Sequence, residues 1–319
     1  MNTDSRVVVI GESLVDLVWR PSADLVRPVP GGSPANVATG LRRLGRPVTL
    51  VTCWGDDPPG KLVARHLMES GLDIVRAPGT SGRTTVALAY INEDSGSATY
   101  EFVPHWDPVD LPTGDGVALL HTGSLAAVVA PGAGKVLEVC ERLHGRPDCA
   151  VSVDLNVRPA MQPDRVAYRA TVERLARVTD IVKASDEDLH WLWPGRDPGD
   201  SARALLSLGP RLIVLTRGSR GATAYTGTHT GEVSVAAPRV QVVDTIGAGD
   251  AFQSALLDGL LVRGADTTLS VRLPDTPGEL RALLTRSVTA GALATTRPGA
   301  QPPGTDELSA ALKATAREG

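Results

Sequence analysis

The sequence predicts an α/β fold in which a mostly parallel central sheet carries helices on both faces. Short apolar runs, such as residues 7–10, alternate along the chain with stretches of helical spacing, as in βαβ units. Leu14–Trp19 and the region 84–102 instead alternate with a period of two, which predicts a small additional β-sheet. The 319 residues are enough for one large domain of this kind or two modest ones.

Each predicted element follows from its local pattern. We expect buried strands at 7–10, Val48–Thr52, 117–121, Ala150–Asp154, 180–183 and Leu212–Thr216. Helices are expected at 35–44, 61–68, 135–143, 167–178 and 201–207, the first with Ser33 as N-cap and Pro34 in its first turn. Residues 84–92 and 98–102 indicate a hairpin, which would belong either to a flap over the strand ends or to an extension of the main sheet. Residues 267–278 are expected to be a surface loop.

Composition excludes several classes of protein. A net charge of −4 leaves no basic field for nucleic acid, so any phosphate must be bound locally. Cys53, Cys140 and Cys149 form no CxxC pair, which argues against a zinc ribbon or a disulfide framework. The first residues lack a signal-peptide pattern, and no apolar run is long enough to cross a bilayer. We therefore expect a cytoplasmic protein without a membrane or nucleic-acid partner.

The most informative motif is residues 244–250, DTIGAGD, followed by a run with helical spacing. Gly247, Ala248 and Gly249 would leave backbone N–H groups free at a helix N-terminus, where an anion binds well. Asp250 would then lie beside the anion as a base, which is an arrangement for phosphoryl transfer. The alternative is a glycine turn with an acidic residue that caps a helix.

A second motif, GGSPANVA at 31–38, supplies candidate sugar ligands. Gly31 and Gly32 would let the backbone approach a ligand closely, and the Asn36 amide can donate and accept hydrogen bonds at once. Asp16, at the exit of the first strand, can accept two hydrogen bonds from a diol. Alone, these residues are equally consistent with an ordinary helix start and an exposed strand carboxylate.

Polar residues follow two further strands. Alternation would place Asp154, Asn156 and Arg158 on one side, as a site wall or as part of a structural salt bridge. Ser185 is a candidate N-cap, with Asp188 completing a capping box, and this acidic cluster could also order water around Mg²⁺.

One more strand end offers phosphate ligands. The turn after Leu212–Thr216, with Gly218 and Gly221, offers donors to a nucleotide phosphate tail, although strand connections often use glycine. Residues 129–136 are not a P-loop, because Val129 and Val136 replace its first Gly and its Ser or Thr. No dinucleotide fingerprint is present, which argues against an oxidoreductase.

These motifs, in this order over residues 7–308, resemble the ribokinase-like, PfkB-type carbohydrate kinases, and most closely the fructokinases. The resemblance implies a single ribokinase-like domain over 1–319, with lid segments at about 12–30 and 84–107. It assigns catalysis to Asp250 with Gly247, Ala248, Gly249 and Arg158. It assigns sugar binding to Asp16, Gly31, Gly32, Asn36, Arg158 and Asp250.

The resemblance also implies ATP and Mg²⁺ as cofactors, leaves K⁺ open, and makes pairing of lid edges into a homodimer an expectation. It assigns the nucleotide to Lys183, Ser185, Thr216, Arg217, Gly218, Gly221, Gly247 and Gly249. The family commonly has Asn-x-x-Glu where this chain has Ser185 to Asp188, so the shorter Asp188 would reach a metal only through water.

The substrate is expected to be a neutral sugar, with D-fructose converted to fructose 6-phosphate. Residues 84–106 contain no Arg or Lys for a sugar acid, and Glu101 would repel one if it faced the pocket. The alternatives are 2-keto-3-deoxygluconate kinase and ribokinase. A nucleoside kinase is a weaker alternative, which the aromatic residues of the flap keep open because a base would need an aromatic or apolar pocket. A non-catalytic sensor on the same fold is the competing class.

Overall fold

The computed structural model describes residues 5–20, 22, 25–91, 98–227, 231–264 and 268–318. Its largest sheet has nine strands in the order β13-β12-β11-β10-β9-β8-β1-β4-β5, of which only β12, next to the edge strand β13, runs antiparallel to the others. These strands are β1 Arg6–Ile10, β4 Val48–Thr52, β5 Asp73–Arg76, β8 Val117–Gly123, β9 Ala150–Asp154, β10 Ile181–Ser185, β11 Leu212–Thr216, β12 Ala222–Thr226 and β13 Glu232–Val235. The predicted mostly parallel sheet is confirmed.

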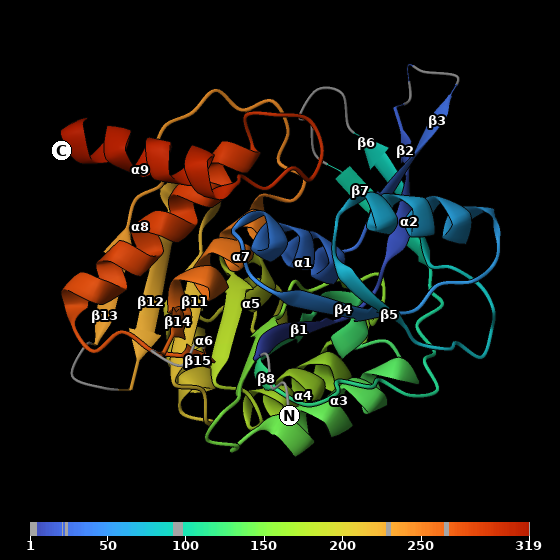
Figure 1. Cartoon of the computed structure of the whole chain (residues 1–319), viewed down its shortest axis with the longest axis horizontal. Coiled ribbons are helices and arrows are strands. Elements are labelled where there is room, and N and C mark those ends of the chain that lie inside the picture. The colour runs from blue at the N-terminus through green and yellow to red at the C-terminus, as the bar shows by residue number, and fades with distance from the viewer. Residues whose placement is uncertain are drawn as a thin grey trace.

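Helices cover both faces of this sheet (Figure 1). One face carries α1 Ser33–Arg43, α7 Ala248–Leu260 and α8 Pro277–Ala294, and α9 Thr305–Glu318 packs on α8. The other carries α3 Gly132–Leu143, α4 Arg165–Ala176, α5 Asp186–Leu192 and α6 Pro198–Leu206. Alternate residues of β1 enter the two cores, with Val7 and Val9 on the first face and Val8 and Ile10 on the second. Because the strands are buried on both faces, their sequences are continuously apolar.

A separate small sheet has the order β3-β2-β6-β7 and stands apart from the large sheet in Figure 1. Its strands are β2 Leu14–Trp19, β3 Val26–Gly31, β6 Val86–Ile91 and β7 Ala98–Val103, and α2 Pro58–Glu69 packs against β2 and β3. The predicted hairpin is therefore part of a second sheet rather than of the main one. Its expected turn at 93–97 lies outside the described residues.

Two details of the prediction were wrong. Part of the expected loop at 267–278 is ordered structure, since Leu269–Val271 forms β15, paired with β14 Leu261–Arg263, and α8 begins at Pro277. The N-cap of α1 is Gly32 rather than the predicted Ser33, which is the first helical residue. The long helices α8 and α9 were not predicted.

No helix of the described part is long and apolar enough to cross a membrane.

A buried carboxylate ties three of these elements together. Asp258, near the end of α7, accepts a hydrogen bond from Arg46 Nε at 2.6 Å and a second from Arg286 on α8. Asp258 is 5% exposed, so removing its charge would leave two arginines without their buried partner. This cluster holds α7, and with it the N-terminus of α7, against its neighbours.

Candidate functional site

The candidate site lies where the carboxyl ends of the parallel strands meet. The predicted site residues follow β9, β10 and β11, and the N-termini of α1 and α7 reach the same edge. In open α/β sheets this edge is where ligands bind. The small sheet supplies Asp16 from β2, so residues from both sheets converge here.

The N-terminus of α7 forms only part of the predicted anion cradle, because the N–H of Ala248, predicted to be free, donates to Thr245 O at 3.2 Å. Gly247 is its N-cap and has a φ of 75°, and an added Cβ would lie 2.6 Å from Ala300 Cβ. Only glycine fits this left-handed, crowded position without strain. The first helical turn closes with Ala251 N–H donating to Gly247 O at 2.9 Å, so the N–H groups of Gly249 and Asp250 remain at the open end of the helix. These are the donors that an anion requires.

The Asp250 side chain is held from the opposite helix. Ser33 Oγ donates to Asp250 Oδ1 at 2.7 Å, and Asn36 Nδ2 donates to Oδ2 at 2.8 Å. Ser33 therefore does not cap α1 as predicted, because its hydroxyl is used to orient Asp250. Sequence reasoning missed this role, although Ser33 stands in the motif between Gly32 and Asn36. The two motifs, more than 200 residues apart, thus meet through one carboxylate.

Asp16 and Arg158, both predicted sugar ligands, lie close enough to interact electrostatically. Burial raises the pKa of Asp16 to about 6, the Arg158 guanidinium opposes that rise and Asp250 adds to it. The three charged groups are therefore close enough to interact. Tyr100 lies in the same neighbourhood, since Asp16 and Arg158 both act on its pKa, and its ring stacks on Phe102 at 5.9 Å between centroids.

The register of the small sheet decides which side chains share the face of Asp16. Asp16 is opposite Ala87 and Ala87 is opposite Phe102, so these three point to one side. Glu101 is next to Phe102 and points to the other side, where Tyr90 Oη donates to it at 3.3 Å. Glu101 therefore does not face the pocket and cannot repel a sugar acid. Arg27, opposite Val18, shares the face of Asp16.

Both predicted glycines, Gly31 and Gly32, are closely packed against the residues around Asp16. An added Cβ on Gly31 would lie 2.6 Å from Asp16 Oδ2. Gly32 has a φ of 116°, and its Cβ would lie 2.4 Å from Glu12 O. A side chain at either position would enter the space beside Asp16 or displace the chain at Glu12, which supports the predicted close approach of this backbone.

An ion pair lies beneath the anion cradle. Lys183 Nζ donates to Asp154 Oδ2 at 2.6 Å, and both side chains are almost fully buried. A Cβ built on Gly249 would lie 3.7 Å from the same Nζ, so the ammonium reaches the helix N-terminus. Burial raises the pKa of Asp154, and the ammonium opposes the rise. Asp154 Oδ1 has no protein partner in the described chain.

The predicted alternation of Asp154, Asn156 and Arg158 was wrong. β9 ends at Asp154, and Asn156 has a φ of 36°, so the chain leaves the extended conformation there. Asn156 Nδ2 donates to Ser124 Oγ at 3.1 Å, while Arg158 reaches the neighbourhood of Asp16 from the turn. The polar residues after β9 therefore lie in a turn and not in a continuation of the strand.

The predicted capping box at α5 is confirmed. Ser185 Oγ accepts from Asp188 N–H at 3.0 Å, and Asp188 Oδ2 accepts from Ser185 N–H at 2.8 Å. Asp188 Oδ1 also accepts from Val157 N–H at 2.8 Å. Both carboxylate oxygens of Asp188 thus accept backbone N–H groups. Its structural role is confirmed, and its metal role stays a prediction.

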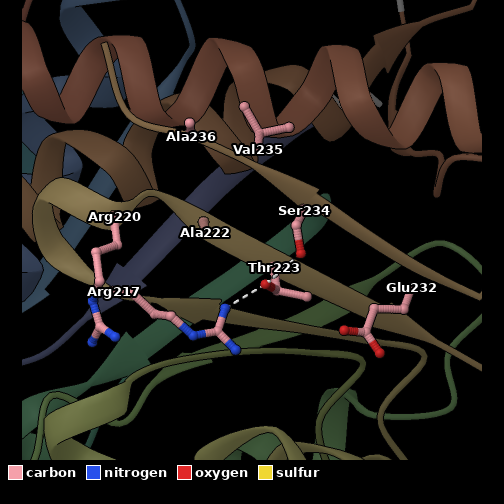
Figure 2. Close-up of a pocket in the computed structure, with 8 residues that line it drawn as sticks. All are labelled: Arg217, Arg220, Ala222, Thr223, Glu232, Ser234, Val235 and Ala236. Atoms are coloured by element: carbon pink, nitrogen blue, oxygen red, sulfur yellow. Dashed lines mark hydrogen bonds between the residues drawn. The ribbon is translucent and has the colours of Figure 1, made fainter. Parts of the chain in front are cut away.

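The turn after β11 carries the predicted nucleotide residues Thr216, Gly218 and Gly221. The guanidinium of Arg217 turns away along β12 and donates to Thr223 and Tyr225. Figure 2 shows Arg217 and Arg220 beside the surface of β12 and β13. They line a shallow pocket of about 420 Å³, together with Ala222, Thr223, Glu232, Ser234, Val235 and Ala236. This pocket adjoins the turn but contains neither Asp250 nor Asp16.

Comparison with known proteins agrees with this geometry. Residues 4–307 match the pfkB family of carbohydrate kinases. A fructokinase of Rhizobium leguminosarum bv. trifolii is 34% identical over 266 residues, which cover 80% of this chain and 79% of that protein.

Two solved structures have the same fold over nearly the whole chain. The fructokinase of Vibrio cholerae, a double mutant solved with fructose, ADP and potassium, has a TM-score of 0.75 and 27% identity, and the alignment covers 98% of each chain. The aminoimidazole riboside kinase of Salmonella enterica, solved with its riboside and an ATP analogue, has a TM-score of 0.77 and 27% identity over 96% of this chain and 99% of that one. The fold is ribokinase-like, the enzyme is a phosphotransferase that acts on a sugar hydroxyl, and the chain belongs to the pfkB family of carbohydrate kinases.

Proposed function

We propose that this enzyme transfers the γ-phosphoryl group of ATP to the terminal primary hydroxyl of a neutral sugar, most simply D-fructose to fructose 6-phosphate. The observation that carries the proposal is the Asp250 carboxylate, held by Ser33 and Asn36 at the open N-terminus of α7. A base fixed beside an anion cradle suits attack by a hydroxyl on a phosphoryl group.

The proposed reaction divides the site by role. Asp250 takes the proton of the sugar hydroxyl, the hydroxyl oxygen bonds to the γ-phosphorus, and ADP leaves. The N–H groups at Gly249 and Asp250, with the positive end of α7 and the Lys183 ammonium, stabilise the charge on the transferred group. Asp16, Gly31, Gly32, Asn36 and Arg158 hold the sugar.

The nucleotide is proposed to lie along the turn from Thr216 to Gly221, with its phosphates directed at the α7 cradle. The Lys183 ammonium, which reaches this helix N-terminus, supports that direction because it would attract the negatively charged phosphates. Mg²⁺ bound with ATP would neutralise phosphate charge, and Asp188 would meet it through water because its oxygens already accept backbone N–H groups. The fructokinase relative solved with potassium makes a monovalent cation a further candidate.

A riboside is the second candidate substrate. Tyr100 and Phe102 present stacked rings on the face of the small sheet that carries Asp16, and a flat base could pack there. The Salmonella riboside kinase supports this alternative. A sugar acid also stays open, because Glu101 points away and Arg27 shares the face of Asp16.

We also propose that the chain is a single kinase domain, that the small sheet acts as its lid, and that the enzyme works in the cytoplasm as a homodimer through that sheet. β3 and β7 are the edge strands, and Val26 and Val103 on them are about half exposed. Free strand edges with apolar side chains suit pairing with a second copy. Three buried free cysteines suit a reducing compartment.

The test is ADP release with Mg-ATP against fructose, ribose, 2-keto-3-deoxygluconate, aminoimidazole riboside and fructose 6-phosphate. The proposal expects fructose to give the highest kcat/KM. A higher value for the riboside would replace fructose with the second candidate. No release with any sugar, together with ligand-induced stabilisation against heating, would instead support a non-catalytic sensor.

A further inference from the structure

Two residues with unfavourable backbone conformations touch each other at the site. Among the residues that the structure describes, Ser124 and Asn156 are the only non-glycine residues with positive φ, at 54° and 36°. They follow the adjacent strands β8 and β9, whose last residues Gly123 and Asp154 are paired. The hydrogen bond from Asn156 Nδ2 to Ser124 Oγ at 3.1 Å joins the two turns. Such conformations persist only where their surroundings enforce them.

Glu12 is the third member of this cluster. It lies two residues beyond β1, the strand on the other side of β8, and is 2% exposed. Its Oε2 accepts from Ala126 N–H at 3.0 Å, which fixes the short helical turn that begins at Ser124. Burial raises the pKa of Glu12 to about 7, while hydrogen bonds, including one with Ser124, and the Arg158 charge lower it. A buried carboxyl group such as that of Glu12 is tolerated only where hydrogen-bond or charge partners compensate for its burial.

The cluster ends at Arg158. Its backbone is fixed from the other side, where Arg158 N–H donates to Tyr168 Oη at 3.2 Å. Arg158 Nη1 donates to Val157 O at 3.1 Å, which holds the guanidinium against the turn, and its charge lowers the pKa of both Glu12 and Asp16. A single residue, Val157, separates Asn156 from Arg158, which means that a change in the Asn156 conformation would redirect the arginine.

We propose that Glu12, Ser124 and Asn156 form a positioning clamp that holds the Arg158 guanidinium beside Asp16 in the sugar pocket. The clamp residues act through Arg158 and do not touch the reacting atoms. The strain at Ser124 and Asn156 is retained because relaxing either turn would move Arg158 away from Asp16. This inference rests on the proposed function, in which Arg158 and Asp16 hold the sugar.

The first test measures the strain. Asn156→Gly and Asn156→Ala both lose the hydrogen bond to Ser124, but only glycine adopts the native φ without cost. We expect Asn156→Ala to have the lower Tm. An alanine variant that melts at or above the glycine variant would overturn the clamp, because the position would then carry no strain.

The second test measures positioning. Glu12→Gln keeps an acceptor for Ala126 N–H and removes the charge that faces Arg158, and Asn156→Gly frees the turn. Both are expected to raise the sugar KM on the order of tenfold while the KM for ATP stays unchanged. The matched control is Ser13→Ala, which removes a buried 2.9 Å hydrogen bond from Thr52 beside Glu12 but outside the clamp. A sugar KM within about twofold of wild type in both variants would refute positioning, whatever their Tm.

A double-mutant cycle shows whether the clamp acts through the arginine. In an Arg158→Ala background, Asn156→Gly should add almost nothing to the sugar KM. Full additivity would contradict the proposal. If the wild-type chain phosphorylated no sugar, the proposed function would be refuted separately from the clamp. The clamp would still be tested by the Tm of Asn156→Ala relative to Asn156→Gly, and by whether the Tm changes in the double-mutant cycle are additive.

Discussion

Gly247→Ala tests the anion cradle with a single added methyl group. An alanine at a φ of 75° costs about 1–2 kcal/mol for its backbone conformation. Its Cβ would lie 2.6 Å from Ala300 Cβ, well inside the ~3.5–4.0 Å at which two carbons pack. Overpacking of this kind adds about 1–3 kcal/mol unless the backbone moves. The cheapest relief is a shift of the α7 N-terminus away from Ala300, which displaces the N–H groups of the cradle.

Loss of one well-aligned donor to a developing oxyanion lowers kcat by about 10²–10³. We therefore expect Gly247→Ala to lose at least about 10² in kcat, with a smaller change in the sugar KM because Asp16 and Arg158 are untouched. The assay is ADP release, measured well below the Tm of each variant. A thermal melt of the same samples reports the cost to stability.

The matched control is Gly145→Ala at the far end of the sheet. Gly145 has a φ of 80°, and nothing lies within 4 Å of an added Cβ, so its alanine pays for the backbone strain alone. The control should lose about 1–2 kcal/mol of stability and keep its kcat. If Gly247→Ala kept a kcat within about threefold of this control, the crowded glycine would not be part of the catalytic cradle.

Three further predictions concern charge. The sugar KM should rise as the pH falls through about 6, because Asp16 is then protonated and accepts fewer hydrogen bonds from sugar hydroxyls. Asp16→Asn should flatten this pH dependence. An equal rise of the KM in the variant would assign the pH dependence to another group. Asp258→Asn should destabilise the fold by about 3 kcal/mol in denaturant titration, because the two partly buried arginines lose the charge of their buried partner. A midpoint equal to that of wild type would show that solvent replaces the interaction. Lys183→Met should lower kcat about 10²-fold without changing the sugar KM, as expected for a charge that acts on the phosphoryl group; a raised sugar KM with normal kcat would place the lysine on the other substrate.

Local patterns were enough to predict the main architecture. Continuous apolar strands, such as Val48–Thr52, identify a sheet that is buried on both faces, and period-two strands mark the small sheet. Helix α8 was missed because its buried positions run without a break over 287–291 and include small and polar residues, so that part gives no periodic apolar signal. The motifs around Asn36 and Asp250 supplied predicted site residues that do meet, although each motif alone also fits an ordinary helix start.

Other features of the site depend on tertiary contacts that a sequence does not display. Ser33 has the residue type of an N-cap, and only the approach of α7 makes Asp250 its partner. The orientation of Glu101 follows from the register between β6 and β7, and a shift of one residue would reverse it. The turn at Asn156 breaks the alternation that would continue β9, because Ser124 holds it in the left-handed region.

The most direct measurement compares Asp250→Asn with wild type in sugar binding and in turnover. The variant keeps the size of the side chain and an acceptor for Ser33 or Asn36, so fructose should still stabilise the protein against heating to a similar extent. Turnover should fall about 10²-fold or more, because the base is lost. Near-normal turnover in Asp250→Asn would contradict the assignment of this carboxylate as the base of the phosphoryl transfer.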